Sequence, residues 1–182
     1  MKTITLYEFN ELSKEAQDTA IRNYCPHYDM DFVIKEETET LEELGFTDVS
    51  LCYRISFSQG DHVKTNGDIS FADAVKLTGY KLSVLKTKVI DDWVELEITG
   101  SRVNVSWYYD RDLNYVDATV AAVVRELEDW IERNDKAIYR RLSDELMEQL
   151  SDESKRADLE AFPDTWYFEN YQGAYITKSN MP

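Results

Sequence analysis

The feature that most constrains the fold is an apolar stripe through the C-terminal part of the chain. From about Asp117, apolar side chains recur every three or four residues, which is the spacing of one face of an α-helix. The stripe comprises Val120, Val123, Val124, Leu127, Ile131, Ile138, Leu142, Leu146 and Leu150. A helix of this length must bury its stripe against another element. A break near Asn134-Asp135 stays open at this point, and a further helix is expected from Ser151 to Ala161, before Pro163.

The middle of the chain predicts the sheet on which such a helix packs. From Val49 to Phe57, apolar and polar residues alternate, which indicates a strand with one buried face. Residues 94–98 and 103–107 alternate in the same way around Thr99-Gly100-Ser101, and they predict a β-hairpin. Between these strands we expect a polar loop over residues 58–68, with a turn at Asn66-Gly67.

The N-terminal part predicts a short strand followed by helices. The strand is expected over 3–9, and Ser13 is typical of the residue that caps a helix N-terminus. A second helix is expected from Met30 to Leu44, ended by Gly45, and a short helical segment over 72–78. The aromatic segment 165–176 is expected to dock on the core. The predicted fold class is therefore α+β: an antiparallel sheet with N-terminal helices and a long C-terminal helical region packed on it, in a single domain over 1–182.

Net charge limits the choice of partner. The chain has 36 Asp and Glu against 20 Lys and Arg, a formal net charge of −16. Such a charge repels nucleic acid and anionic membranes at long range and attracts basic surfaces. The two cysteines, Cys25 and Cys52, lack a CxxC spacing, and the chain shows neither a signal peptide nor a long apolar run. We therefore expect a cytoplasmic protein with reduced thiols and no membrane partner.

Catalytic and metal-binding patterns are weak. His27 and His62 do not have zinc spacing, and a calcium loop starting at Asp61 places its glycine at the wrong position. Adjacent carboxylates occur as Asp91-Asp92, Asp110 with Asp112, and Glu36-Glu37, but pairs are common in so acidic a chain. No nucleophile or phosphate-loop motif is present. We expect no enzyme, cofactor or metal; a metal-dependent hydrolase with a carboxylate cluster stays as the alternative from another class.

One segment departs from the acidic trend. Between Ala74 and Ile90 the chain carries lysines and no acid. The lysines are Lys76, Lys81, Lys86 and Lys88. Lysines beside Tyr80 can contact a phosphate backbone, which makes a small DNA-binding phage accessory protein an alternative function. The competing interpretation is that they are edge-strand lysines that discourage aggregation.

Two segments resemble a known protein family. The first is Tyr7-Glu8-Phe9-Asn10-Glu11-Leu12-Ser13-Lys14-Glu15-Ala16-Gln17, and the second is Ile55-Ser56-Phe57-Ser58-Gln59-Gly60-Asp61. Both are similar to segments of small phage and prophage proteins, and the chain looks most like type II-A anti-CRISPR proteins. The resemblance implies stoichiometric inhibition of the nuclease Cas9 in the bacterial cytoplasm, with or without contact to double-stranded DNA. It implies no catalytic residue.

These observations together predict an inhibitor that binds Cas9 or its complex with guide RNA. Carboxylates compete with phosphates for the same guanidinium groups, so an acidic surface can occupy a nucleic-acid site. The candidate partner-binding residues are exposed acids of the long helix, namely Glu126, Glu128, Asp129, Glu132 and Asp135. Gln59, Gly60 and Asp61 form a weaker second patch. As exposed charges, the helix acids are expected to contribute little to folding.

Overall fold

The computed structural model describes residues 6–26, 29–57, 59–108, 114–161, 166–169 and 174–177. The fold class is α+β, with N-terminal helices, an antiparallel four-stranded sheet and a long C-terminal helix. By its internal contacts the chain divides into two compact units. Unit 1 comprises Met1–Asp29 with Asp144–Pro182, and unit 2 comprises Met30–Ser143. The single domain expected over 1–182 stays a prediction.

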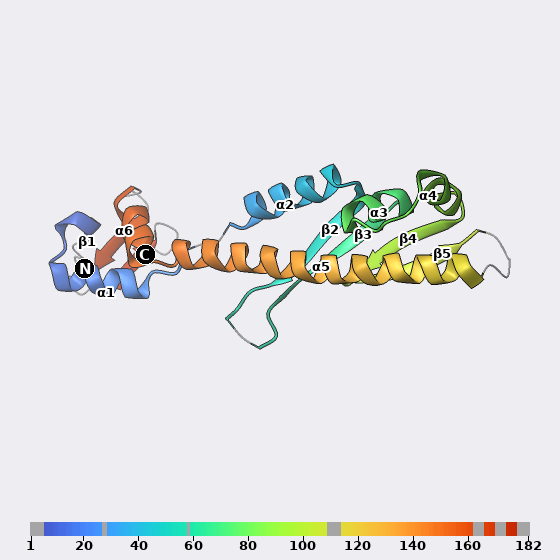
Figure 1. The fold of residues 1–182 in the computed structure, drawn as a ribbon. Helices are drawn as coiled ribbons and strands as arrows, with labels where there is room; N and C mark the ends of the chain where they lie inside the picture. Colours follow the sequence, from blue (N-terminus) through green and yellow to red (C-terminus); the bar gives the residue numbers. More distant parts are fainter. Residues whose placement is uncertain are drawn as a thin grey trace. The chain divides into compact units, whose positions relative to one another are not determined.

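Unit 2 is built on the four-stranded sheet. Its strands are β2 (Phe46–Arg54), β3 (His62–Ile69), β4 (Val94–Thr99) and β5 (Arg102–Trp107), ordered β2-β3-β4-β5 with every neighbouring pair antiparallel. The helices are α2 (Asp31–Glu43), α3 (Phe71–Thr78), α4 (Val84–Asp91) and α5 (Asn114–Gln149), whose last turns belong to unit 1. Figure 1 shows α5 crossing the strands, with α2, α3 and α4 along one side of it.

The core of unit 2 lies between one face of the sheet and these helices. On β4 the residues alternate strictly between buried and exposed, so Leu96 and Ile98 enter the core and Glu95 and Glu97 face away from it. The apolar stripe of α5 supplies fully buried residues to the same cluster, Leu127 and Ile131 among them. Apolar residues recur every two residues on the strand and every 3.6 residues on the helix. The apolar face of the sheet therefore packs against the apolar face of the helix.

Unit 1 joins the two ends of the chain. It contains β1 (Leu6–Tyr7), the short 3-10 helix η1 (Phe9–Glu11), α1 (Lys14–Asn23), α6 (Asp152–Ala161), β6 (Trp166–Glu169) and β7 (Ala174–Thr177). Strands β1, β6 and β7 form a three-stranded antiparallel sheet in the order β1-β6-β7. Ser13 caps α1 as predicted, because its side chain accepts a hydrogen bond from the Ala16 amide. Leu159 of α6 is buried against Phe9 and the apolar residues of α1.

The structure confirms most predicted elements. The helices expected over 30–44 and 72–78 are α2 and α3, the hairpin around Gly100 is β4–β5, and the helix before Pro163 is α6. The long helix runs through Asn134-Asp135 without a break. Within it Asp135 faces inward, where its carboxylate accepts hydrogen bonds from the hydroxyl groups of Thr65 and Ser101.

Four predictions of local structure are wrong, and one helix was not expected. The polar loop expected over 58–68 contains most of strand β3, and within the described part of the strand expected over 3–9 only Leu6–Tyr7 is a strand, since a 3-10 helix begins at Phe9. Asn66-Gly67 lies inside strand β3 and does not form a turn. The strand expected to reach Phe57 ends at Arg54, and its partner β3 begins at His62. Helix α4 was not expected from the sequence, because its apolar residues lie on more than one side and give no clear stripe.

Within the described residues, no helix combines the length and the apolar character needed to cross a bilayer.

Candidate partner-binding surfaces

The loop between β2 and β3 is closed by its own side chains. The Asp61 carboxylate accepts hydrogen bonds from the Ser56 amide at 2.8 Å and from the Ser56 hydroxyl at 2.7 Å. The His62 Nδ1 atom lies 2.8 Å from the Gly60 carbonyl oxygen. Gln59 and Gly60 are exposed between these contacts. Of the predicted patch Gln59, Gly60 and Asp61, the acid therefore shapes the loop, and the first two residues face solvent.

The same loop presents Phe57 to solvent. Its side chain is 53% exposed, whereas the alternation of the sequence predicted that it faces the core. Its φ of 54° lies in the left-handed region, which aromatic residues seldom adopt. The Asp61 contacts to the neighbouring Ser56 stabilise the turn in which this conformation occurs.

A cavity of about 340 Å³ brings the two predicted patches together. Its charged and polar lining residues are Asp61, His62, Lys64, Ser101, Glu132, Asp135, Lys136 and Tyr139. The side chains come from the start of β3, the β4–β5 turn and α5. The lining contains both acids and bases, and the Glu132 carboxylate lies 2.6 Å from the Lys136 ammonium group. This hydrogen bond lowers the pKa of Glu132. The charge of the lining is therefore mixed.

Asp135 is buried, and this corrects the prediction that it belongs to an exposed acidic surface. Asp135 is 6% exposed, and its carboxylate accepts hydrogen bonds from the Thr65 hydroxyl at 2.6 Å and from the Ser101 hydroxyl. Thr65 belongs to β3, and Ser101 belongs to the β4–β5 turn. Asp135 therefore ties the helix to two parts of the sheet and is a residue of the fold.

Glu128 also serves the fold. Its Oε1 atom accepts a hydrogen bond from the Val103 amide at 3.1 Å. Strand β5 is an edge of the sheet, so this amide points away from β4 and needs a partner. The helix carboxylate supplies it, and Glu128 is only half exposed as a result.

Glu126, Asp129 and Glu132 are the three predicted helix acids that face solvent. Exposed arginines, Arg125 and Arg133, interrupt them on the same helix. The exposed surface of α5 is consequently of mixed charge and is a weaker anionic surface than the list of acids suggested.

Helix α2 carries a denser acidic surface that the sequence interpretation missed. Its 13 residues include six acids and one lysine, Lys35. Val33 and Leu41 face the core, so by the helical period Phe32, Glu36, Glu39 and Glu43 lie on the opposite side. Phe32 is 67% exposed. We call these four residues the α2 stripe. The signal was available in the run of acids from Glu36 to Glu43.

Arg141 of α5 joins α2 to the long helix. Its guanidinium group contacts the Glu37 carboxylate at 2.6 Å and also forms an ion pair with Glu36. Hydrogen bonds to Glu37 and then to Glu36 raise the pKa of Arg141. The remaining acids of the stripe, Glu39 and Glu43, are exposed, and Glu39 lies 3.7 Å from Lys35.

The four candidate lysines belong to two neighbouring helices and the segment between them. Lys76 lies on α3, where its ammonium group is 2.7 Å from the Asp73 carboxylate. This contact raises the pKa of Lys76 and lowers that of Asp73. Lys81 precedes α4, and Lys86 and Lys88 lie on it, all three exposed. Lys76 is thus paired with Asp73 on α3, the other three lie before or on α4, and none of the four lies on an edge strand.

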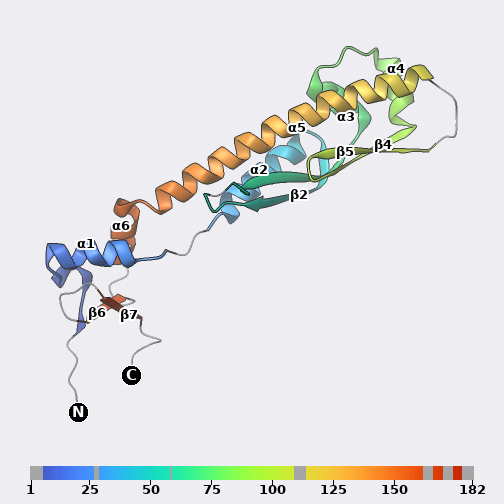
Figure 2. The ribbon, with the colours of Figure 1, turned by 90° about the horizontal axis from the view of Figure 1, so that it is seen from below.

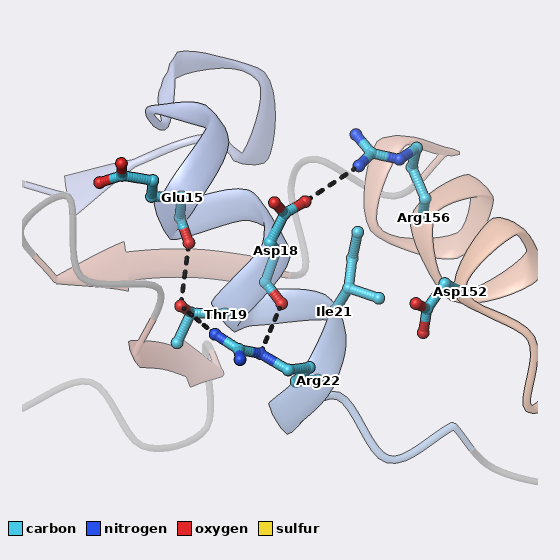
Figure 3. Close-up of a pocket in the computed structure, with 7 residues that line it drawn as sticks. All are labelled: Glu15, Asp18, Thr19, Ile21, Arg22, Asp152 and Arg156. Atoms are coloured by element: carbon cyan, nitrogen blue, oxygen red, sulfur yellow. Dashed lines mark hydrogen bonds and ion pairs between the residues drawn. The ribbon is translucent and has the colours of Figure 1, made fainter.

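A second cavity, of about 390 Å³, lies within unit 1 between α1 and α6 (Figure 3). Arg22 donates to the Asp18 carbonyl oxygen and to the Thr19 hydroxyl, and Arg156 lies 3.7 Å from the Asp18 carboxylate. The acids Glu15 and Asp152 complete its charged lining. Both arginines are thus oriented by groups of unit 1 itself.

The open face of the sheet holds four acids close together. Burial, and then repulsion from Asp48, Glu95 and Glu97, raise the pKa of Asp68. Asp68 and Glu97 are directly paired across β3 and β4. Like charges at such a position oppose strand pairing.

Asp68→Asn is therefore expected to raise the melting temperature at pH 7. A raised pKa means that the folded state holds the proton more tightly than the unfolded state does. The ionised carboxylate costs stability above the folded-state pKa and costs nothing below the unfolded-state value. The gain should disappear as the pH falls below about 4, which thermal melting at several pH values will show. Asp129→Asn, on the arginine-bearing face of α5, is the control; an equal gain from it would contradict the role of the cluster.

The described residues contain no group of three or more His, Cys, Asp or Glu side chains arranged to hold a metal ion. Comparisons with protein families, with curated proteins and with solved structures find no match for this chain.

Proposed function

We propose that this chain is a binding protein that inhibits a nuclease of the host defence, with Cas9 as the first target to test. The observation that carries the proposal is the α2 stripe, where the exposed carboxylates of Glu39 and Glu43 lie on the same side of the helix as the exposed ring of Phe32. Aromatic residues are frequent at the centres of protein interfaces, and carboxylates give electrostatic complementarity to a basic partner.

The stripe suits a partner that normally holds nucleic acid. RNA-guided nucleases bind their nucleic acids in positively charged channels and read a short DNA motif with arginines. The carboxylates of Glu39 and Glu43 can pair with such arginines, since carboxylates and phosphates offer similar acceptor geometry. Inhibition of this kind needs one bound copy for each nuclease and no chemical step. Cas9 is chosen as the first target because two segments of the chain resemble type II-A anti-CRISPR proteins.

The experiment is a titration of Cas9 cleavage. We expect plasmid cleavage to fall in proportion to added protein and to stop near one equivalent, whether the guide RNA is loaded first or not. Stoichiometric loss separates a binding inhibitor from a hydrolase, which would act at a small fraction of an equivalent and would be stopped by a chelator. Complete cleavage at several equivalents would rule out Cas9 as the target.

Two matched variants locate the surface. The first is Glu39→Gln, Glu42→Gln and Glu43→Gln on α2; the second is Glu126→Gln, Asp129→Asn and Glu132→Gln on α5. Each removes three exposed charges. We expect the α2 variant to need at least about tenfold more protein for the same inhibition, because truncating interface charge pairs costs about 2 kcal/mol or more. A larger loss from the α5 variant would move the surface to α5, and no loss from either would end the phosphate-competition mechanism.

A further inference from the structure

Strand β2 is an edge of the four-stranded sheet, and its outer side offers unused backbone groups (Figures 1 and 2). In the ladder with β3, Leu51 lies opposite Thr65, whose carbonyl oxygen accepts a hydrogen bond from the Ser101 amide on the other side of β3. Backbone groups alternate in direction along a strand, so the N–H and C=O groups of Leu51 and Tyr53 point away from β3. Within the part of the chain that the structure describes, no other group bonds to them.

The other edge of the sheet is protected in a way that β2 is not. On β5 the outward amide of Val103 donates to the Glu128 carboxylate at 3.1 Å. Proteins also protect edge strands with lysine or proline, and β2 contains neither. Its bulge after Thr47 leaves the ladder with β3 regular from Ser50 to Arg54. An edge of this kind is complementary to another strand.

The sequence of β2 is complementary to itself about Leu51. When two copies of the strand run antiparallel with Leu51 opposite Leu51, the outward backbone groups of these two residues face each other and form two hydrogen bonds. The side chains then meet residues of like or opposite character. The pairs are Ser50 with Cys52, Val49 with Tyr53, and Asp48 with Arg54. Apolar pairs and opposite charges across two strands stabilise their pairing.

The charges on the open face of the sheet fit the same arrangement. Arg54 ends β2, and Lys64 of β3 lies near it on the same face; both are exposed. Toward the other end of β2 lie Asp48 and the acids around Asp68, and their mutual repulsion contributes to the raised pKa of Asp68. Antiparallel pairing across β2 brings the basic end of each copy beside the acidic end of the other.

We propose that β2 pairs with β2 of a second copy of this chain, antiparallel and centred on Leu51, so that two four-stranded sheets become one. The result is a closed two-fold dimer, since each copy gives and receives the same contacts. The net charge of −16 opposes association at long range. At about 0.15 M salt the screening length is about 8 Å, so distant repulsion is screened while contacts of a few ångströms persist.

Tyr53→Pro tests the backbone pairing. Proline removes the outward N–H group of residue 53 and none of the hydrogen bonds to β3, and edge strands tolerate it at such a position. Self-association should weaken about tenfold or more, because each copy loses one hydrogen bond to the other. Sedimentation velocity at high micromolar concentration measures the change, and thermal melting checks that the variant is folded.

Trp107→Pro is the matched control on the other edge. By the same alternation that directs the Val103 amide outward, the Trp107 N–H group points away from β4. The side chains of Tyr53 and Trp107 are 42% and 44% exposed, so the two substitutions remove similar surface. Trp107→Pro should leave self-association unchanged.

Arg54→Glu tests the charge pairing without altering the backbone. The new carboxylate would lie beside Asp48 of the second copy, and like charges in contact should weaken self-association about tenfold or more. Arg102→Glu is its control. Arg102 is also exposed on the open face, but it lies on β5, and its substitution changes the net charge by the same amount. It should weaken self-association much less.

Cross-linking tests the register. In a Cys25→Ser background, Ser50→Cys places a thiol opposite Cys52 of the second copy. The two positions form a non-hydrogen-bonded pair, whose Cα atoms lie about 4.5 Å apart, within the range of a disulfide. Mild oxidation should therefore give a covalent dimer. Cys25→Ser alone should cross-link far more slowly, because the two copies of Cys52 are then offset by two residues.

A wild type that stays monomeric at high micromolar concentration overturns the proposal. So does a control on β5 that weakens self-association as much as its counterpart on β2. Cross-linking at the same rate with and without Ser50→Cys would reject the pairing centred on Leu51. The proposal does not rest on nuclease inhibition: these variants leave the α2 stripe intact, so each should inhibit Cas9 as the wild type does.

Discussion

Gly67→Ala is expected to lower the free energy of unfolding by about 3 kcal/mol, although it adds a single methyl group. Gly67 lies in β3 with a φ of 146°, in the region that favours glycine. A Cβ atom there would lie 2.8 Å from the Thr47 carbonyl oxygen and 3.3 Å from the Val49 Cα atom. Both are backbone atoms of β2, where the register shifts between Thr47 and Ser50. The methyl group can be accommodated only by moving one strand away from the other.

Gly79→Ala is the control for this variant. Gly79 follows α3 with a left-handed φ of 68°, but a Cβ atom there would meet no atom within 4 Å. It should cost only about 1 kcal/mol, the conformational part of the effect. Denaturant unfolding of both variants measures the difference. Equal costs would mean that the close approach of β2 to Gly67 contributes nothing.

Asp135→Ala is expected to cost about 2 kcal/mol of stability, because it leaves two hydroxyl groups without their acceptor. The Thr65 hydroxyl is the more expensive of the two to leave without an acceptor, since Thr65 is 1% exposed. Asp135→Asn should cost less, because the amide keeps one acceptor oxygen. Chemical denaturation measures the free energy of unfolding of both variants and shows which one loses more stability.

The control for the Asp135 variants is a variant of the exposed acids on the same helix. Neutralising Glu126, Asp129 and Glu132 together should change the free energy of unfolding by no more than about 0.5 kcal/mol, since exposed pairs contribute little and self-repulsion is relieved. If the triple variant is as unstable as Asp135→Ala, the distinction between exposed and buried acids on α5 is wrong. A variant that lacks all five acids would combine the loss of the buried Asp135 with the loss of exposed charges. The melting temperature of that variant would therefore say nothing about a partner.

The local sequence pattern was enough to predict a helix or strand wherever one hydrophobic periodicity holds over the whole element. The stripe of α5, the alternation of β4 and β5, and the cap at Ser13 predicted their elements, because the signal and the structure both depend on neighbouring residues. Asn66-Gly67 failed for the opposite reason. The dipeptide is typical of a turn, but its glycine is needed where β3 meets the irregular backbone of β2, a contact between residues about twenty positions apart.

The acidic residues show most clearly what the sequence predicts and what only the tertiary structure decides. Composition established the acidic charge, and the periodic pattern predicted an α+β chain with a long helix whose acids were candidates. It could not separate Asp135 from Glu132, because both are carboxylates on one helix and differ only in what lies opposite them. The tertiary structure places two hydroxyl groups from the sheet against Asp135 and leaves Glu132 beside Lys136 in solvent. It also leaves α2 with its acids outward and α4 with apolar residues outward, since exposure depends on which faces the other elements cover.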